Sequence, residues 1–180
     1  MTNNSSALVL AVDLDNTLIK TDMIYIGLKY LISNKIHLSP KLIWIFLTKG
    51  RTYAKKYLFD VTNFSVKDIP FNKEVINFIQ RNRNKYTRTI LISGSYHEYV
   101  NMIADHVNLF DKAVGTSLDT NMVGINKVNF LKNKYKNLIF DYIGDSKKDI
   151  PIWESARNAY VVDNGNIIQY LKGIDYKIIR

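Results

Sequence analysis

The sequence contains no cysteine, so neither a disulfide nor thiolate chemistry is open to this chain. The absence fits a reducing compartment. Its three histidines are scattered, without the spacing of a metal site. No apolar run approaches the roughly 20 residues that a membrane-spanning helix needs, and the polar first residues do not resemble a secretory signal. We therefore expect a cytoplasmic protein whose chemistry uses oxygen and nitrogen groups.

Acidic residues are also few, 16 against 25 lysines and arginines, which gives a net charge of +9. Residues 20–90 hold 14 basic and 4 acidic residues, whereas the rest of the chain holds 11 and 12. The basic excess of this one region suits an anionic substrate, a membrane surface or nucleic acid, and general solubility is the alternative. No recognised nucleic-acid motif is present, so we do not expect nucleic acid as a partner.

Two aspartates follow the first apolar run of the chain, Leu8 to Val12. A run of this length that is rich in aliphatic residues is typical of a buried parallel strand. Ligands of open parallel sheets bind outside the carboxyl ends of the strands, where Asp13 and Asp15 would lie. Two carboxylates so close together are costly unless a cation lies between them, and a divalent cation would serve. The alternative is an ordinary turn, for which Asp-Asn is suitable.

The second half of the chain alternates between strand and helix patterns. Buried strands are predicted at residues 89–92, 112–115, 138–143 and 159–162, with an edge strand at 176–179. Helices are predicted between them, with Asn72, Ser95 and Asn126 as caps, Pro151 opening one more, and a last helix at 166–172. Strands separated by helices of about 10–15 residues indicate an α/β fold, a Rossmann-like parallel sheet with helices on both faces.

Residues 22–70 have helical patterns and no strand signal. Asp22 is predicted to cap a helix to about residue 32, whose inner face carries Ile24, Leu28, Leu31 and Ile32. Ser39, as the cap, and Pro40 open a second helix, which begins with the apolar run Leu42–Leu47 and ends near Gly50, before a basic segment. We therefore divide the chain into a core, residues 1–21 and 71–180, and a small helical insertion, residues 22–70.

Three further segments at or near strand ends carry polar groups. Ser93-Gly94-Ser95 offers a hydroxyl and backbone N–H groups beside a helix start, where anions bind. Lys127 lies near another helix start, where a cation opposes the helix dipole and favours a nearby anion. Asp145 and Asp149 follow an apolar strand, and Gly144 allows close approach. Each segment alone fits a turn or a solvated helix, but four such coincidences indicate one site.

The order of these segments, Asp-x-Asp-x-Thr, Ser-Gly-Ser, Gly-x-x-Lys and Gly-Asp-Ser-x-x-Asp, resembles the four motifs of the haloacid-dehalogenase-like (HAD) phosphohydrolases. The resemblance covers residues 8–163. Within it, the first and last motifs are most similar to those of HAD domains fused to, or encoded near, UbiA-type prenyltransferases. Asn16 stands where many relatives have glycine, and asparagine also tolerates left-handed backbone angles.

The resemblance implies a role for each motif. Asp13 would be the nucleophile that takes the phosphoryl group, and Asp15 would be the acid and base. Mg²⁺ would be held by Asp13, the backbone carbonyl of Asp15 and Asp145, while Asp149 would hold a metal-bound water or orient Lys127. Ser93 and the N–H of Gly94 would bind the phosphoryl oxygens, and Lys127 would neutralise charge. The implied activity is phosphomonoester hydrolysis, with a phosphotransferase or phosphonate hydrolase as alternatives.

In this superfamily an insertion between the first two motifs forms a cap over the site, and residues 22–70 fit a small helical cap. Its apolar run predicts either a helix buried on the core or a surface that binds a membrane or a lipid-linked phosphate. The resemblance favours a sugar or prenyl-linked phosphate as the substrate. It also implies an alternative, in which the chain is a non-catalytic or regulatory partner of a membrane prenyltransferase. Such a partner would dock through residues 36–59, peripheral to the inner face of the membrane.

Overall fold

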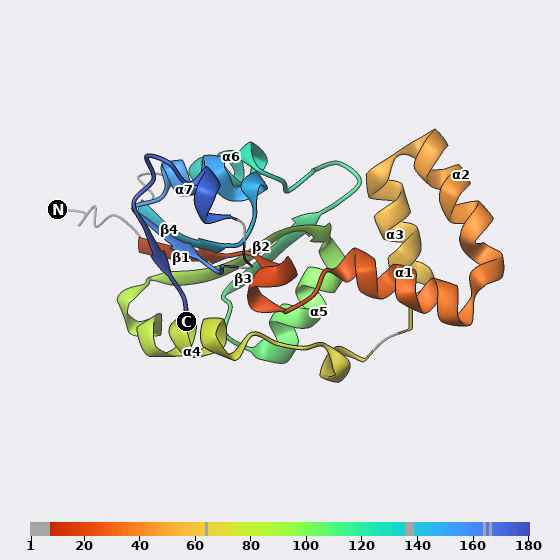
Figure 1. The fold of residues 1–180 in the computed structure, drawn as a ribbon, viewed down its shortest axis with the longest axis horizontal. Helices are drawn as coiled ribbons and strands as arrows, with labels where there is room; N and C mark the ends of the chain where they lie inside the picture. The colour runs from red at the N-terminus through yellow and green to blue at the C-terminus, as the bar shows by residue number, and fades with distance from the viewer. Residues whose placement is uncertain (1–7, 64, 136–138, 164, 166) are drawn as a thin grey trace.

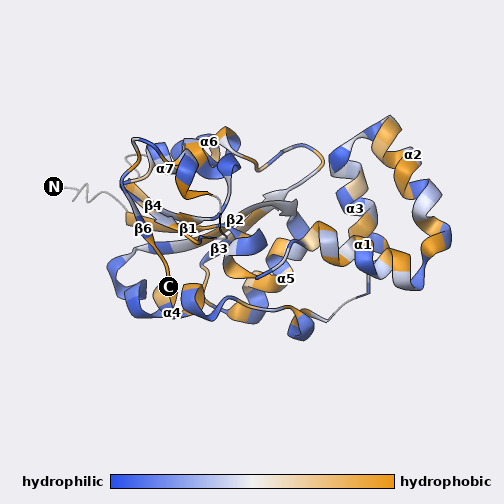
Figure 2. Cartoon of the chain, viewed as in Figure 1, coloured by the Kyte–Doolittle hydropathy of each residue, from blue (hydrophilic) through white to orange (hydrophobic). Residues whose placement is uncertain are grey.

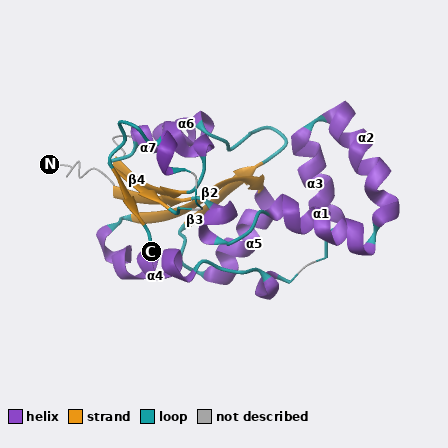
Figure 3. Cartoon of the chain, in the orientation of Figure 1, coloured by secondary structure: helices purple, strands orange, loops and turns teal. Residues whose placement is uncertain are grey.

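A parallel sheet with helices on both faces forms one end of the molecule, and three helices form the other (Figures 1 and 3). The computed structural model describes residues 8–63, 65–135, 139–163, 165 and 167–180. Six strands pair in parallel in the order β3-β2-β1-β4-β5-β6. They are β1 Leu8–Val12, β2 Arg88–Tyr96, β3 Lys112–Thr116, β4 Ile139–Gly144, β5 Asn158–Val161 and β6 Tyr176–Ile178. The predicted Rossmann-like fold class is confirmed.

Four helices cover the two faces of the sheet, α4 and α5 on one side and α6 and α7 on the other (Figure 1). Their bounds are α4 Lys73–Asn82, α5 His97–Val107, α6 Ile125–Lys134 and α7 Ile150–Ser155. The central strand β1 is buried on both faces: Leu10 and Val12 join the cluster under α4 and α5, whereas Val9 and Ala11 join the other. This two-sided burial explains why the strand reads as a continuous apolar run.

The predicted helix caps are correct at two positions and wrong at three. Asp22 and Asn72 accept hydrogen bonds from the N–H groups of Ile24 and Glu74, at 2.6 and 3.2 Å. Ser39 is instead the first residue of its helix and makes no capping hydrogen bond. Ser95 belongs to β2, and Asn126 lies inside α6, which begins after Gly124. The predicted strand residue 138 and helix residue 166 lie outside the described residues.

We call residues 22–70 the cap, and the structure describes three helices in it: α1 Met23–Asn34, α2 Ser39–Lys49 and α3 Arg51–Val61. Gly50, at φ 85°, ends α2 as predicted, and the basic segment after it is α3, a helix that the sequence did not separate. The two ends of the cap meet beside the sheet, because the backbone N–H of Lys20 donates a hydrogen bond to the carbonyl of Pro70 at 2.7 Å. Such closure suits an insertion, and the division into two units stays a prediction.

The cap buries fewer apolar side chains than its sequence predicts. In α1 the buried residues are Met23, Gly27 and Leu31, whereas Ile24 and Ile32 of the predicted inner face are exposed. In α2 only Ile45 is buried, and several neighbouring apolar side chains are exposed to solvent. Figure 2 shows hydrophobic residues along much of this helix. The interpretation of the apolar run as a buried helix is therefore wrong. Within the described residues, no helix has the length and apolar character that crossing a bilayer requires.

Candidate active site

Asp13 and Asp15 lie on a tight turn, Leu14–Leu18, directly after β1. The Asp13 carboxylate accepts a hydrogen bond from the N–H of Leu14 at 2.8 Å, which fixes it at the strand end. Asn16 has φ 53°, in the left-handed region that asparagine tolerates. The turn therefore directs two carboxylates to the carboxyl edge of the sheet, and Asn16 adopts the left-handed conformation within it.

Three donors hold the carboxylate of Asp15. The hydroxyls of Ser95 and Ser93 donate to its Oδ2 at 2.6 and 3.2 Å, and the N–H of Met23 donates to Oδ1 at 2.9 Å. Burial and the neighbouring Asp22 carboxylate raise the pKa of Asp15, and the hydrogen bond from Ser95 lowers it without cancelling the rise. Asp15 therefore keeps a proton to higher pH than an ordinary aspartate and is suited to donate one.

Lys127 is buried between two carboxylates. Its Nζ lies 3.0 Å from Oδ1 of Asp13 and 3.2 Å from Oδ1 of Asp149, and it donates to the Tyr142 hydroxyl at 2.6 Å. Burial, with a smaller effect of the Asp149 carboxylate, raises the pKa of Asp13 to about 8 despite the lowering effect of Lys127. Lys127 by itself therefore does not compensate the buried negative charge, and a further cation at the site would favour ionised Asp13.

Asp149 accepts hydrogen bonds at both carboxylate oxygens. Its Oδ1 takes bonds from Lys127 and from the Tyr142 hydroxyl at 2.7 Å, and its Oδ2 takes bonds from the N–H groups of Asp145 and Ser146 and from the Ser146 hydroxyl. Gly144 makes room for this carboxylate, since a Cβ there would lie 2.8 Å from Oδ2. The geometry thus favours Asp149 as the residue that orients Lys127.

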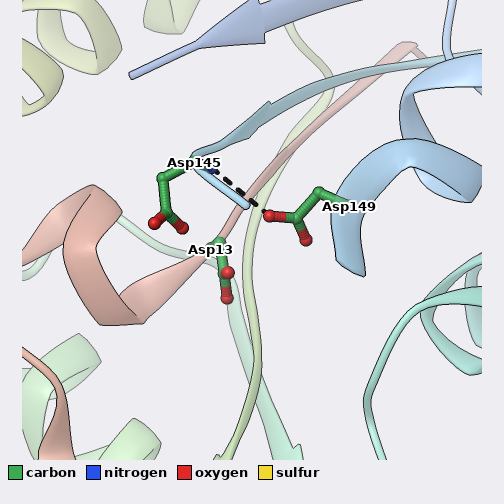
Figure 4. Close-up of side chains that lie close together, drawn as sticks. All are labelled: Asp13, Asp145 and Asp149. Carbon is green, nitrogen blue, oxygen red and sulfur yellow. Dashed lines mark hydrogen bonds between the residues drawn. The ribbon is translucent and has the colours of Figure 1, made fainter. Parts of the chain in front are cut away.

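Asp13, Asp145 and Asp149 form the candidate metal centre. Each offers one carboxylate oxygen, and the three oxygens lie within 4.8 Å of one another. Figure 4 shows the three side chains converging from the ends of β1 and β4 and from the segment before α7. The Thr17 hydroxyl donates to Oδ1 of Asp145 at 3.2 Å and orients it. A cluster of hard oxygen donors fits Mg²⁺.

Ser93 and Gly94 lie in an irregular stretch of β2, where the register to β3 shifts between Ile92 and Tyr96. Such irregularities redirect side chains and are common beside active sites. Here the stretch brings the hydroxyls of Ser93 and Ser95 to Asp15. Gly94 lies so close to Val123 that a Cβ would come within 2.8 Å of its side chain. This position therefore needs glycine.

All the predicted site residues gather at one edge of the sheet, around a pocket of about 140 Å³. A larger hollow of about 530 Å³ beside α6 includes only two ionisable side chains, Asp119 and Lys134. The ionisable side chains that line the small pocket are Asp13, Asp15, Asp22, Lys55, Lys127, Asp145, Lys148 and Asp149. Their concentration there identifies the smaller pocket as the candidate active site.

Sequence reasoning missed three residues of this site. Ser95 was assigned to a helix cap, although its hydroxyl binds Asp15. Tyr142 was not singled out because it lies within an apolar strand. The alternation of side chains between the two faces of that strand could have indicated its hydroxyl. Lys55, from α3, donates to the carbonyl of Gly94 at 2.6 Å across the boundary between cap and core. The sequence indicated that Lys55 lies in a helical segment. The spacing of residues along that segment could not predict that α3 lies over the core.

Comparisons with known proteins confirm the fold. A protein of unknown function from Bordetella pertussis Tohama I has a TM-score of 0.73 at 12% identity, covering 98% of this chain and 99% of that one. A phosphoserine phosphatase in a phospho-aspartyl intermediate analogue has a TM-score of 0.64 at 15% identity, covering 97% and 94%. A HAD family hydrolase from Salmonella enterica serovar Typhi has 0.64 at 14%, covering 96% and 68%. The chain therefore has the fold of the HAD-superfamily hydrolases.

One curated protein supplies a closer sequence match. An uncharacterized protein from Sinorhizobium fredii, y4nM, is 31% identical over 163 residues, which are 88% of this chain. The chain spans only 30% of the length of that relative, so the match bears on one part of a longer protein. No protein-family model matches the chain.

Proposed function

We propose that the chain is a Mg²⁺-dependent phosphatase that hydrolyses a phosphomonoester through an aspartyl-phosphate on Asp13. The observation that carries the proposal is the arrangement of Asp13 and Asp15 on one turn. Asp13 pairs with buried Lys127, whereas Asp15 is held by two serine hydroxyls and has a raised pKa. Adjacent carboxylates in such different environments suit two different roles, nucleophile and proton donor.

In the first step an oxygen of Asp13 attacks phosphorus, and the bond from phosphorus to the ester oxygen breaks. Asp15 gives its proton to that leaving oxygen, so an alcohol departs. In the second step water attacks the phosphorus of the aspartyl-phosphate, Asp15 takes back a proton, and inorganic phosphate leaves with the Asp13 carboxylate restored. Ser93 and the N–H of Gly94 are placed on the segment that holds Asp15, where they would bind the phosphoryl oxygens.

Lys127 would stabilise the charge of Asp13 and of the phosphoryl group, because its ammonium lies 3.0 Å from Asp13. Mg²⁺ would be held by Asp13, Asp145 and the backbone carbonyl of Asp15, with Asp149 beside them. When bound, it would supply further neutralisation of negative charge at the phosphoryl group. Asp149 accepts hydrogen bonds from Tyr142 and Ser146, which hold its carboxylate in the position that orients Lys127.

The size of the pocket favours a small ester. Its volume of about 140 Å³ is well below the roughly 300–1,000 Å³ of pockets that enclose drug-sized ligands. A phosphoryl group with a short polar chain, as in a small sugar phosphate, suits this space. A prenyl-linked phosphate would have to leave its chain outside the pocket, along the cap.

The test is phosphate release from a panel of sugar phosphates, nucleotides, phosphoserine and short prenyl phosphates. We expect turnover that needs Mg²⁺ and disappears in Asp13→Asn, with thermal unfolding confirming that the variant is folded. An ordinary exposed lysine, Lys56→Met on α3, is the matched control and should keep turnover. Turnover that persists in Asp13→Asn, or none on any ester with folded wild type, would overturn the proposal.

The exposed apolar side of α2 favours a second candidate role, contact with an anionic membrane surface. Ile43, Trp44 and Leu47 are 59%, 56% and 74% exposed, and Lys41 and Lys49 lie on the same helix. Apolar and basic side chains together suit an interfacial helix. Sedimentation with vesicles of anionic lipid should pellet the protein at low salt and release it at high salt. Docking on a membrane prenyltransferase stays a prediction.

A further inference from the structure

Two lysines line the pocket without a role in the proposed reaction. Lys55 reaches it from α3 of the cap, and Lys148 reaches it from the segment between β4 and α7. Both belong to the same pocket as Asp13 and Asp15, yet neither pairs with the reacting carboxylates as Lys127 does. These two cations, one from the cap and one from the core, favour the binding of an anionic ligand in this small pocket.

Lys55 lies on the side of the pocket toward which the proposed reaction would direct the leaving group. Its Nζ donates to the carbonyl of Gly94, in the same segment whose serine hydroxyls hold Asp15. Because Asp15 would protonate the leaving oxygen, the remainder of the ester must extend away from the phosphoryl group on this side. Gly94 is the hydrogen-bond partner of Lys55 among the described residues, and an ammonium has three donors, so two remain for a ligand.

The ammonium of Lys55 lies among charges of both signs. Burial lowers the pKa of its ammonium, and the carboxylates of Asp15 and Asp22 raise it without restoring the usual value. Lys148 and Arg51 lower it further, because they bring like charge to the same place. Asp22 is itself engaged in capping α1. A second anionic group on the ligand would relieve this repulsion, as opposite charges do in partly buried sites.

We propose that Lys55 and Lys148 form a second anion subsite, which selects phosphomonoesters whose leaving group carries a carboxylate or a second phosphate. The proposal rests on the phosphatase function and deepens it. The reacting phosphoryl group lies at Asp13 and Lys127, and the second anion lies between the cap and the segment after β4. A charged hydrogen bond of this kind contributes about 1.5–3 kcal/mol, which corresponds to roughly 10- to 150-fold in binding.

Matched substrate pairs test the proposal. We would compare kcat/KM for 3-phosphoglycerate with glycerol 3-phosphate, and for fructose 1,6-bisphosphate with fructose 6-phosphate. The first pair tests a carboxylate and the second tests a phosphate. Wild type should prefer the more anionic ester in at least one pair, by about tenfold or more. Lys55→Met should reduce that preference by a similar factor, Lys55→Arg should retain most of it, and Lys56→Met should leave it unchanged.

A binding measurement keeps the subsite separate from the proposed activity. Calorimetric titration of Asp13→Asn with the same four esters and Mg²⁺ reports affinity without turnover. If no ester is hydrolysed but the more anionic ones bind more tightly in a Lys55-dependent manner, the anion subsite is supported and the phosphatase function is overturned. If wild type shows no preference within either pair, or if Lys55→Met lowers both members of a pair equally, the subsite is overturned and Lys55 only fastens the cap to Gly94.

Discussion

The core and the cap differ in how their polar and apolar side chains are partnered. At the carboxyl edge of the sheet, the buried ammonium of Lys127 contacts the buried carboxyl groups of Asp13 and Asp149 at hydrogen-bond distances. In the cap, large apolar side chains of α2 are exposed to solvent. Buried charges are costly unless they are paired, so the contacts among these side chains fix the geometry of the core site. The exposed apolar side chains of α2 do not fix the geometry of the candidate site. Their role therefore depends on the molecule that binds to this face of the cap.

Lys55 is the exception that joins these two regions. It belongs to a cap helix, but its ammonium bonds to Gly94 in the core site. The proposed chemistry therefore depends on residues of the core, whereas the proposed choice of substrate depends on a contact between the two regions.

Replacing the nucleophile should have the largest effect. Asp13→Asn removes the oxygen that attacks phosphorus, and we expect kcat to fall about 10⁴-fold or more, as when other catalytic nucleophiles are removed. The measurement is phosphate release with the best substrate of the panel under saturating Mg²⁺. A loss of less than about tenfold would mean that Asp13 does not form the intermediate.

Replacing Asp149 should affect activity and stability together. Asp149→Asn removes a buried charge that pairs with Lys127, and we expect the free energy of unfolding to fall by about 3 kcal/mol. We expect kcat to fall about 10²-fold as well, because Lys127 loses its orientation. Chemical denaturation and steady-state kinetics measure the two effects. Tyr142→Phe is a comparison variant that removes a hydroxyl bonded to both Lys127 and Asp149 but keeps the ion pair between them, and it should cost about 2 kcal/mol.

Removing the shortest hydrogen bond to Asp15 should shift the pH profile. Ser95 donates to the ionised form of Asp15 and lowers its pKa, so Ser95→Ala should raise that pKa further. Asp15 must be protonated to act as the acid, and the descending limb of kcat/KM should therefore move to higher pH. Ser117→Ala, in an exposed turn, is the control. A shift to lower pH would contradict the proposed role of Asp15.

The sequence predicted where the candidate site residues gather better than it predicted the cap, and the reason is geometric. The carboxyl ends of parallel strands meet at one edge, so residues at the ends of β1, β2 and β4 had to gather once the strands were recognised. The contact of Lys55 with Gly94 depends instead on how α3 lies over the core, which no local pattern specifies. Ser95 was misassigned because serine before a helix suits both a cap and a binding loop.

The apolar run of α2 was ambiguous for a different reason. Six consecutive apolar residues surround a helix, because each residue turns by about 100°, so they cannot all contact one neighbour. Packing against α3 buries Ile45 and leaves Trp44 and Leu47 exposed. The pattern therefore identified a helix but not which of its sides was covered.

The smallest effect is expected at this exposed side of α2, and a pair of substitutions on one helix tests it. Ile45 is 8% exposed and Leu47 is 74% exposed. Ile45→Ala should lower the free energy of unfolding by about 2 kcal/mol, whereas Leu47→Ser should change it by less than about 0.5 kcal/mol. Urea denaturation measures both. If Leu47→Ser keeps its stability but loses sedimentation with anionic vesicles, the exposed face serves a membrane contact. If Leu47→Ser costs as much as Ile45→Ala, this face is buried in the folded protein, and the contrast between core and cap no longer holds.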